Sequence, residues 1–121
     1  MEHGPDTRLP KRCLLRKTSE YQKVYRQGKR LRGNRFSLIL LPNNLGYSRF
    51  GISIHGEKKA VRRNRLKRII RETFRLKRHL IVPSLDIVVA VRKNCPFYWQ
   101  RDIEKAMLDL LHKQGFLETK E

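Results

Sequence analysis

Residues 58–78, with the sequence KKAVRRNRLKRIIRETFRLKR, decide how the rest of the chain is arranged. Within them, apolar residues such as Leu66 and Ile70 recur at the spacing of a helix and fall on one side of it. A helix turns about 100° per residue, so Arg68 and Arg71 point to nearly the opposite side. We therefore expect a helix whose apolar side packs on a core and whose cationic side requires a polyanionic partner.

The positive charge of the chain is concentrated in two segments. The net charge is +18 in 121 residues: residues 1–35 carry eleven basic and three acidic residues, residues 58–78 carry eleven and one, and the remainder is neutral. Nucleic acid, an anionic membrane and an acidic protein are the partners that suit such a pattern. We expect no membrane association, because the apolar side of the helix is short and mostly aliphatic. With two cysteines, no zinc spacing and no signal peptide, the chain is expected to be cytoplasmic.

The remaining periodicities predict a single α+β domain. Its folded part is expected at residues 18–117, between a flexible basic arm at residues 1–17 and a tail at residues 118–121. The predicted elements are helices at 18–28, about 60–80 and 97–114, strands at 36–41, 48–54 and 85–92, and an optional short edge strand within 29–35. This order, α-β-β-(β)-α-β-α, indicates an α/β sandwich built on one mixed sheet.

The strand at 48–54 alternates between two kinds of side chain. Phe50, Ile52 and Ile54 point to one face, which we expect to pack on the core. Gly51 and Ser53 point to the other face. Because these side chains are small, that face leaves room for another group to approach the strand.

Three aromatic residues on the predicted helices are candidates for the core or for a binding site. Tyr21 and Tyr25 lie four residues apart on one face of the first helix, so spacing alone favours packing. Both roles are compatible, since one edge of a ring can pack while its face stacks on an unpaired base. Trp99 is predicted to be a core residue, because it starts the apolar stripe that continues through Ile103 and Leu110.

The sequence offers no arrangement typical of a catalytic or metal site. None of the four histidines forms a closely spaced pair with a carboxylate, and no spacing suits zinc ligands or an activated nucleophile. Asp86 is the one acid in its strand, and a lone carboxylate at a strand end more often caps a backbone group or forms an ion pair than binds Mg²⁺. Protein nucleases usually gather several carboxylates around their metal ions. We therefore predict no catalytic and no metal-binding residues.

Two consecutive motifs point to a known family. Residues 49–54 read RFGISI, and residues 60–75 read AVRRNRLKRIIRETFR. Together they resemble the signature of the bacterial ribonuclease P protein family, including its Arg-Asn-Arg at residues 63–65. Weaker similarity at residues 15–28 and 86–92 extends the resemblance to about residues 11–113.

The resemblance implies a topology and two binding surfaces. The basic helix is implied to lie in a left-handed crossover between parallel strands, an exception to the usual right-handed rule. The same helix is implied to contact the catalytic RNA of ribonuclease P through Arg62, Arg63, Asn64, Arg65, Lys67, Arg68, Arg71 and Arg75. A cleft between the first helix and the sheet is implied to hold the single-stranded 5′ leader of precursor tRNA, lined by Lys17, Tyr21 and Tyr25.

The chain departs from the family pattern at two places. The loop at residues 55–59, HGEKK, lacks the usual Ser-Lys-Lys run, so no loop-specific RNA or metal contact is carried over. Ile39 stands where the family often has an aromatic residue, so no stacking role is assigned to it.

On these grounds the chain is expected to be the protein subunit of ribonuclease P, the endonuclease that removes the 5′ leader from precursor tRNA. Its expected partners are the catalytic RNA and the leader, with no obligate protein partner. Mg²⁺ is expected to be bound mainly by the RNA and the substrate, and the protein alone is expected not to be catalytic. Two alternatives stay open: a structural RNA-binding protein of ribosomal type, and a basic DNA-binding protein.

Overall fold

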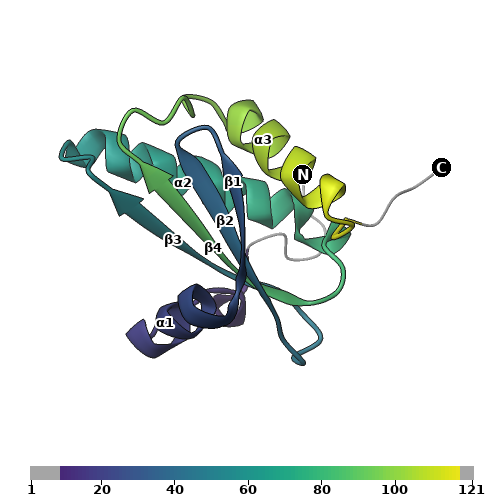
Figure 1. The fold of residues 1–121 in the computed structure, drawn as a ribbon. Coiled ribbons are helices and arrows are strands. Elements are labelled where there is room, and N and C mark those ends of the chain that lie inside the picture. Colours follow the sequence, from purple (N-terminus) through teal and green to yellow (C-terminus); the bar gives the residue numbers. More distant parts are fainter. Residues whose placement is uncertain (1–8, 118–121) are drawn as a thin grey trace, which may run out of the picture.

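Three helices cover the two faces of a four-stranded sheet in the computed structural model, which describes residues 9–117 (Figure 1). The strands are β1 (Lys29–Gly33), β2 (Phe36–Pro42), β3 (Arg49–His55) and β4 (Leu85–Arg92). The helices are α1 (Thr18–Gln27), α2 (Ala60–Lys77) and α3 (Gln100–Lys113), and two single 3₁₀ turns are η1 (Lys11–Cys13) and η2 (Arg78–Leu80). α1 lies on one face of the sheet, and α2 and α3 lie on the other, which confirms the predicted α/β sandwich.

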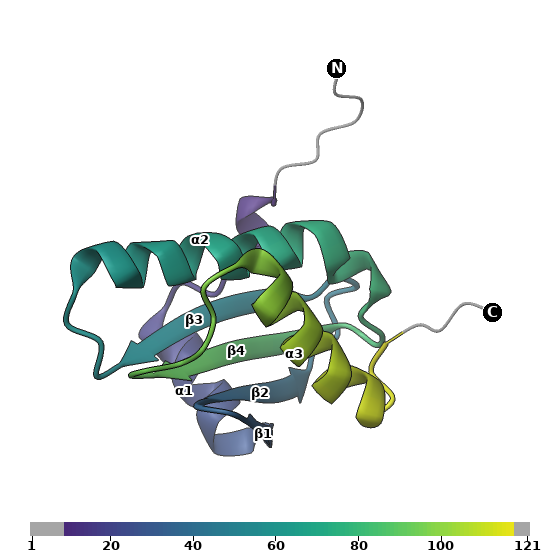
Figure 2. The same ribbon diagram turned by 90° about the horizontal axis from the view of Figure 1, so that it is seen from above.

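The sheet is mixed, with the strand order β1-β2-β4-β3. β2 runs antiparallel to both β1 and β4, whereas β3 runs parallel to β4. α2 therefore connects two adjacent parallel strands. In Figure 2 both strands point left, α2 lies on the viewer's side, and β4 lies below β3, so the crossover is left-handed as the resemblance implied.

The core consists of two layers, one on each face of the sheet. β4 is buried along residues 85–91, as expected of its β-branched sequence, and it contributes to both layers. The larger layer joins the sheet to α2 and α3. The smaller layer joins it to α1 through Val24, Ile39 and Val88, which are all at most 1% exposed. Ile39 is thus a packing residue.

The apolar side predicted for α2 is confirmed. Its buried residues are Leu66, Ile69, Ile70, Thr73 and Phe74. Phe74 stacks on Phe50 of β3 with a centroid distance of 4.1 Å and an interplanar angle of 11°. This contact seats the helix on the parallel pair and turns its basic side outward.

The second half of the predicted N-terminal arm is part of the folded unit. Cys13 and Leu15 are 1% and 5% exposed, and the Leu15 N–H donates to the Phe50 carbonyl at 2.8 Å. Leu14 also forms a parallel bridge with Phe50, so this segment extends the sheet locally. The boundary differs from the predicted residue 18 because the apolar residues at 13–15, Cys13, Leu14 and Leu15, pack against the sheet. Residues 1–8 and 118–121 lie outside the described residues.

The prediction that Trp99 belongs to the core is wrong. Trp99 is 57% exposed and occupies the position before the first residue of α3, with extended backbone angles of φ −128° and ψ 157°. Helical periodicity therefore does not extend to it. Phe97 takes the buried position instead, 3% exposed and 4.9 Å from the Phe36 ring between centroids.

Candidate nucleic-acid interface

The outward side of α2 is a row of cations with one acid. Arg63, Asn64, Arg68 and Arg71 are exposed along it. The acid is Glu72, which accepts a hydrogen bond at 3.0 Å from the Nε of Arg75, and this contact lowers the pKa of the Glu72 carboxyl. The helix thus keeps a strongly positive surface, because its single carboxylate is already paired.

Arg62 and Arg65 differ from the rest of the predicted set because they are half-buried against the segment before α3. Arg62 donates to the carbonyls of Phe97 and Cys95, the latter at 2.6 Å, and its guanidinium lies 4.4 Å from the centroid of the Tyr98 ring. Arg65 donates from Nε to the Tyr98 carbonyl at 2.9 Å. These two arginines therefore hold the β4–α3 connection, whatever else they bind.

A groove runs between α1, β3 and α2, with a volume of about 380 Å³. We call it the α1–α2 groove, and its polar lining is Arg16, Tyr21, Lys67 and Arg71 over the backbone of Gly51. Lys67 and Arg71 also line a neighbouring hollow of about 660 Å³ on the outward side of α2. The groove and the cationic side of α2 are consequently one continuous surface.

Tyr21 forms the inner wall of the α1–α2 groove. Its ring lies over Gly51, where an added Cβ would come within 2.5 Å of the ring carbon Cζ. The Tyr21 hydroxyl accepts a hydrogen bond at 3.3 Å from the Ile52 N–H, and burial raises the pKa of this hydroxyl. The small-residue face of β3 therefore admits the Tyr21 ring, which packs on one side and lines the groove on the other.

The structure does not gather Lys17, Tyr21 and Tyr25 in one pocket. Tyr25 is half-buried against the α1 layer, its hydroxyl is buried with no hydrogen-bond partner, and it borders a separate hollow. Lys17 is exposed at the start of α1 and lines another hollow beside Arg49. Of the three predicted leader-binding residues, Tyr21 alone lines the α1–α2 groove.

Sequence reasoning missed Arg16 and Arg49. Arg16 lines the groove, and the only signal for it was its place in a basic segment. Arg49 donates to both carboxylate oxygens of Asp86, at 2.9 and 2.6 Å, and to Glu20 at 3.1 Å. Asp86 is 5% exposed, and of the two roles expected of it, capping or pairing, the structure shows the ion pair.

The bridge from Glu20 through Arg49 to Asp86 fixes α1 on the sheet. Glu20 also accepts hydrogen bonds from the backbone N–H groups of Arg16 and Lys17, at 2.8 and 3.0 Å. These two hydrogen bonds lower the pKa of the Glu20 carboxyl, and the positive charge of Arg49 lowers it by a smaller amount. Because Tyr21 follows Glu20 directly, the same contacts set where its ring enters the groove.

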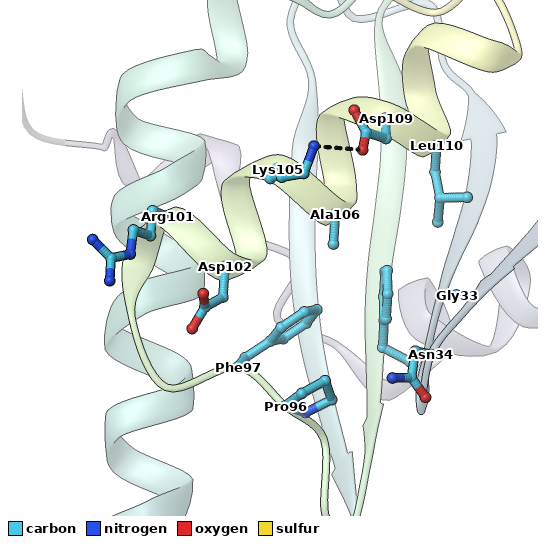
Figure 3. A pocket seen from close by; sticks show the side chains of 11 residues that line it. Gly33, Asn34, Pro96, Phe97, Arg101, Asp102, Lys105, Ala106, Asp109 and Leu110 are labelled. Carbon is cyan, nitrogen blue, oxygen red and sulfur yellow. Dashed lines mark ion pairs between the residues drawn. The ribbon is translucent and has the colours of Figure 1, made fainter.

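A further hollow lies elsewhere, between α3 and the turn after β1 (Figure 3). It has a volume of about 780 Å³, an apolar floor that includes Phe97 and Leu110, and a rim of mixed charge in which Lys105 pairs with Asp109 at 3.6 Å. It is not part of the cationic surface. Within residues 9–117 no cluster of three or more potential metal ligands occurs, and no helix there is long and apolar enough to cross a membrane.

The chain is an α+β sandwich in which a basic helix faces outward beside an open groove. These features are those of a small protein that binds a polyanion through one face. Comparison with known families is more specific. The model of the family described as Ribonuclease P matches residues 9–115, and the chain belongs to this family.

Individual relatives agree with this assignment. The chain is 52% identical over 101 residues to the ribonuclease P protein component of Desulfotalea psychrophila, covering 83% of this chain and 84% of the relative. The solved ribonuclease P protein of Thermotoga maritima is 33% identical, with a TM-score of 0.72 over 82% of this chain and 94% of that one. The Staphylococcus aureus protein is 25% identical, with a TM-score of 0.76 over 88% and 98% of the two chains.

Proposed function

We propose that this chain is the protein subunit of a ribonuclease P ribonucleoprotein, in which it holds RNA while an RNA subunit cleaves the 5′ leader from precursor tRNA. The observation that carries the proposal is the continuity between the cationic side of α2 and the α1–α2 groove. Lys67 and Arg71 line both, so two RNA segments can lie side by side across one helix.

The cationic side of α2 binds the structured catalytic RNA. Lysine and arginine neutralise phosphates and release counterions, and arginine also donates to phosphate oxygens through its planar fork. Arg63, Asn64, Arg68 and Arg71 are exposed and can reach phosphates without breaking any contact described above. Arg62, Arg65, Lys67 and Arg75 complete the proposed set, although Arg62 and Arg65 also hold the β4–α3 connection.

The α1–α2 groove binds the single-stranded leader. Tyr21 presents a ring on which an unpaired base can stack, while Arg16, Lys67 and Arg71 surround it with charges for the phosphates. Lys17 and Tyr25 lie outside this groove, so in our proposal they contact the leader only where it leaves the groove along α1.

The RNA and the substrate bind Mg²⁺, and the protein favours this binding by fixing their phosphates. The buried carboxylate of β4, Asp86, already accepts hydrogen bonds from Arg49 and from Asn43, the latter at 2.7 Å. It therefore lacks the open coordination sites that a hydrated Mg²⁺ ion needs.

Reconstitution tests the proposed function. Added to the RNA of a bacterial ribonuclease P at low Mg²⁺ concentration, the protein should raise the cleavage rate of a precursor tRNA. It should also bind precursor tRNA more tightly than mature tRNA when the RNA is present. Equal affinity for the two tRNAs with no gain in cleavage would instead indicate a structural RNA-binding protein, and equal affinity for duplex DNA at matched salt would indicate a DNA-binding protein.

A further inference from the structure

Tyr98 and Trp99 form an exposed aromatic pair on the flank of α2 that faces away from the α1–α2 groove. They are 55% and 57% exposed, whereas the other large apolar side chains exposed in the described part of the chain are aliphatic. Arg62 and Arg65, which contact this pair, lie on the α3 flank of α2, and Lys67 and Arg71 lie on the groove flank. The roles proposed above leave the pair unused.

The two rings are held in place by arginines and by the start of α3. The Arg62 guanidinium lies 4.4 Å from the Tyr98 ring centroid, and the Arg65 guanidinium lies 4.9 Å from that of Trp99. Asp102 accepts hydrogen bonds from the backbone N–H groups of Tyr98 and Trp99, at 3.0 and 2.8 Å. Figure 3 shows Asp102 in the first turn of α3, beside the segment that carries the pair.

In this arrangement each ring carries a cation over one face, yet each side chain is still more than half exposed. A ring that is already fixed loses little conformational freedom when a second flat group stacks on it. Stacking on a base is favourable whatever the base, because every base has a π-face, and a nearby arginine strengthens it and attracts the adjoining phosphate. A nucleotide supplies both the flat group and the negative charge.

We propose that Tyr98 and Trp99 form a stacking platform for an unpaired nucleotide of the RNA that the cationic side of α2 binds. This inference rests on the proposed function, since it assigns a further contact to the same RNA. The platform adjoins the first two turns of α2, where Arg62 and Arg65 link it to the row that continues through Arg68. It is separated from the leader groove by the helix itself, so the occupant comes from the catalytic RNA.

Trp99 is the only tryptophan of the chain, which provides a direct probe. The full-length protein is titrated with the RNA of a bacterial ribonuclease P, and tryptophan fluorescence is followed together with an independent binding measurement. Stacking on a base is expected to quench the fluorescence in parallel with binding. Unchanged fluorescence at saturation would overturn the proposal.

Substitution of Trp99 separates stacking from a supporting role. Trp99→Leu should weaken RNA binding by about tenfold, or about 1.4 kcal/mol, and Trp99→Phe should retain most of the affinity. The salt dependence of binding should stay unchanged, because no phosphate contact is lost. A salt slope reduced by about one in Trp99→Leu would show that the ring only positions Arg65, and would overturn the proposal.

Leu45→Ala is the matched control. Leu45 is 46% exposed in the turn after β2, at the opposite end of the sheet from Phe97, so its truncation should leave RNA affinity unchanged. If the wild-type protein binds the RNA and Trp99→Leu binds equally well, the platform is refuted while the proposed function stands. If the wild-type protein does not bind the RNA, both proposals are refuted.

Discussion

Gly51→Ala should displace the Tyr21 ring and thereby damage the α1–α2 groove. The added Cβ would lie within 2.5 Å of both Cζ and the hydroxyl oxygen of Tyr21, which is closer than any van der Waals contact allows. The ring must therefore move, and its hydrogen bond from the Ile52 N–H is lost. We expect reduced stability together with weaker leader binding.

The magnitude follows from two opposing effects. Overpacking costs about 1–3 kcal/mol, whereas alanine in a strand recovers about 0.5–1 kcal/mol relative to glycine, and the midpoints of these ranges give a net loss in the free energy of unfolding of about 1 kcal/mol. In a Tyr21→Ala background the obstructing ring is absent. There, the same Gly51→Ala change should stabilise the protein by about 0.5 kcal/mol.

The assay is a double-mutant cycle on four proteins: the wild type, Gly51→Ala, Tyr21→Ala and the double variant. Urea unfolding of each protein is monitored by far-ultraviolet circular dichroism, and the affinity of each protein for precursor and for mature tRNA is measured as well. Ser53→Ala, on the same face of β3, serves as the control and should leave the tRNA preference unchanged. Both single changes at the groove should reduce the preference for precursor tRNA. Additive effects of Gly51→Ala and Tyr21→Ala on stability would refute the described contact.

Three other outcomes can be measured. Arg49→Met should lower the free energy of unfolding by about 3 kcal/mol, because it leaves the Asp86 carboxylate buried without its cation; a loss under 1 kcal/mol in urea unfolding would contradict this. Glu20→Gln should destabilise the protein at neutral pH, because the lowered pKa of Glu20 means that its ionised carboxylate stabilises the folded state. The destabilisation should shrink as the pH falls below the ordinary glutamate pKa of about 4.3 and the carboxylate becomes protonated, and a difference independent of pH in urea unfolding would argue against this reasoning. Replacing Arg63 and Arg68 together by alanine should weaken RNA binding and reduce its salt slope by about one for each lost phosphate contact. Lys113→Ala, which removes one cation at the end of α3 and none from α2, serves as the control and should leave the slope unchanged.

The order of elements could be predicted from the sequence because each element depends mainly on local periodicity. The apolar side of α2, the alternation in β3 and the buried run of β4 are all patterns within one segment. The edge strand β1 was only an optional element, since its sequence is dominated by basic residues. The family resemblance, rather than periodicity, supplied the left-handed crossover.

Contacts between distant segments could not be predicted. Spacing placed Trp99 in the core, but the chain is extended at that residue and enters the helix only at Gln100. The pairing of Arg65 with Trp99, like that of Tyr21 with Gly51, depends on which loops the tertiary fold brings together. The candidate RNA-binding set was accordingly predicted as a row of cations with Asn64 among them, without the division between exposed members and those that hold the β4–α3 connection.

The position of β4 has a consequence for how the chain folds. β4 is a central strand of the sheet, yet it is the last strand in the sequence, and Leu38 on one side and Ile52 on the other both pair with Val89. No ladder connects β2 to β3 directly, so a nascent chain that ends before residue 85 cannot assemble the four-stranded sheet, because the strand that joins β2 to β3 is still missing. Such long-range pairing slows folding relative to helical proteins of similar size. During synthesis, the basic helix α2 therefore leaves the ribosome before the sheet that will orient it can exist.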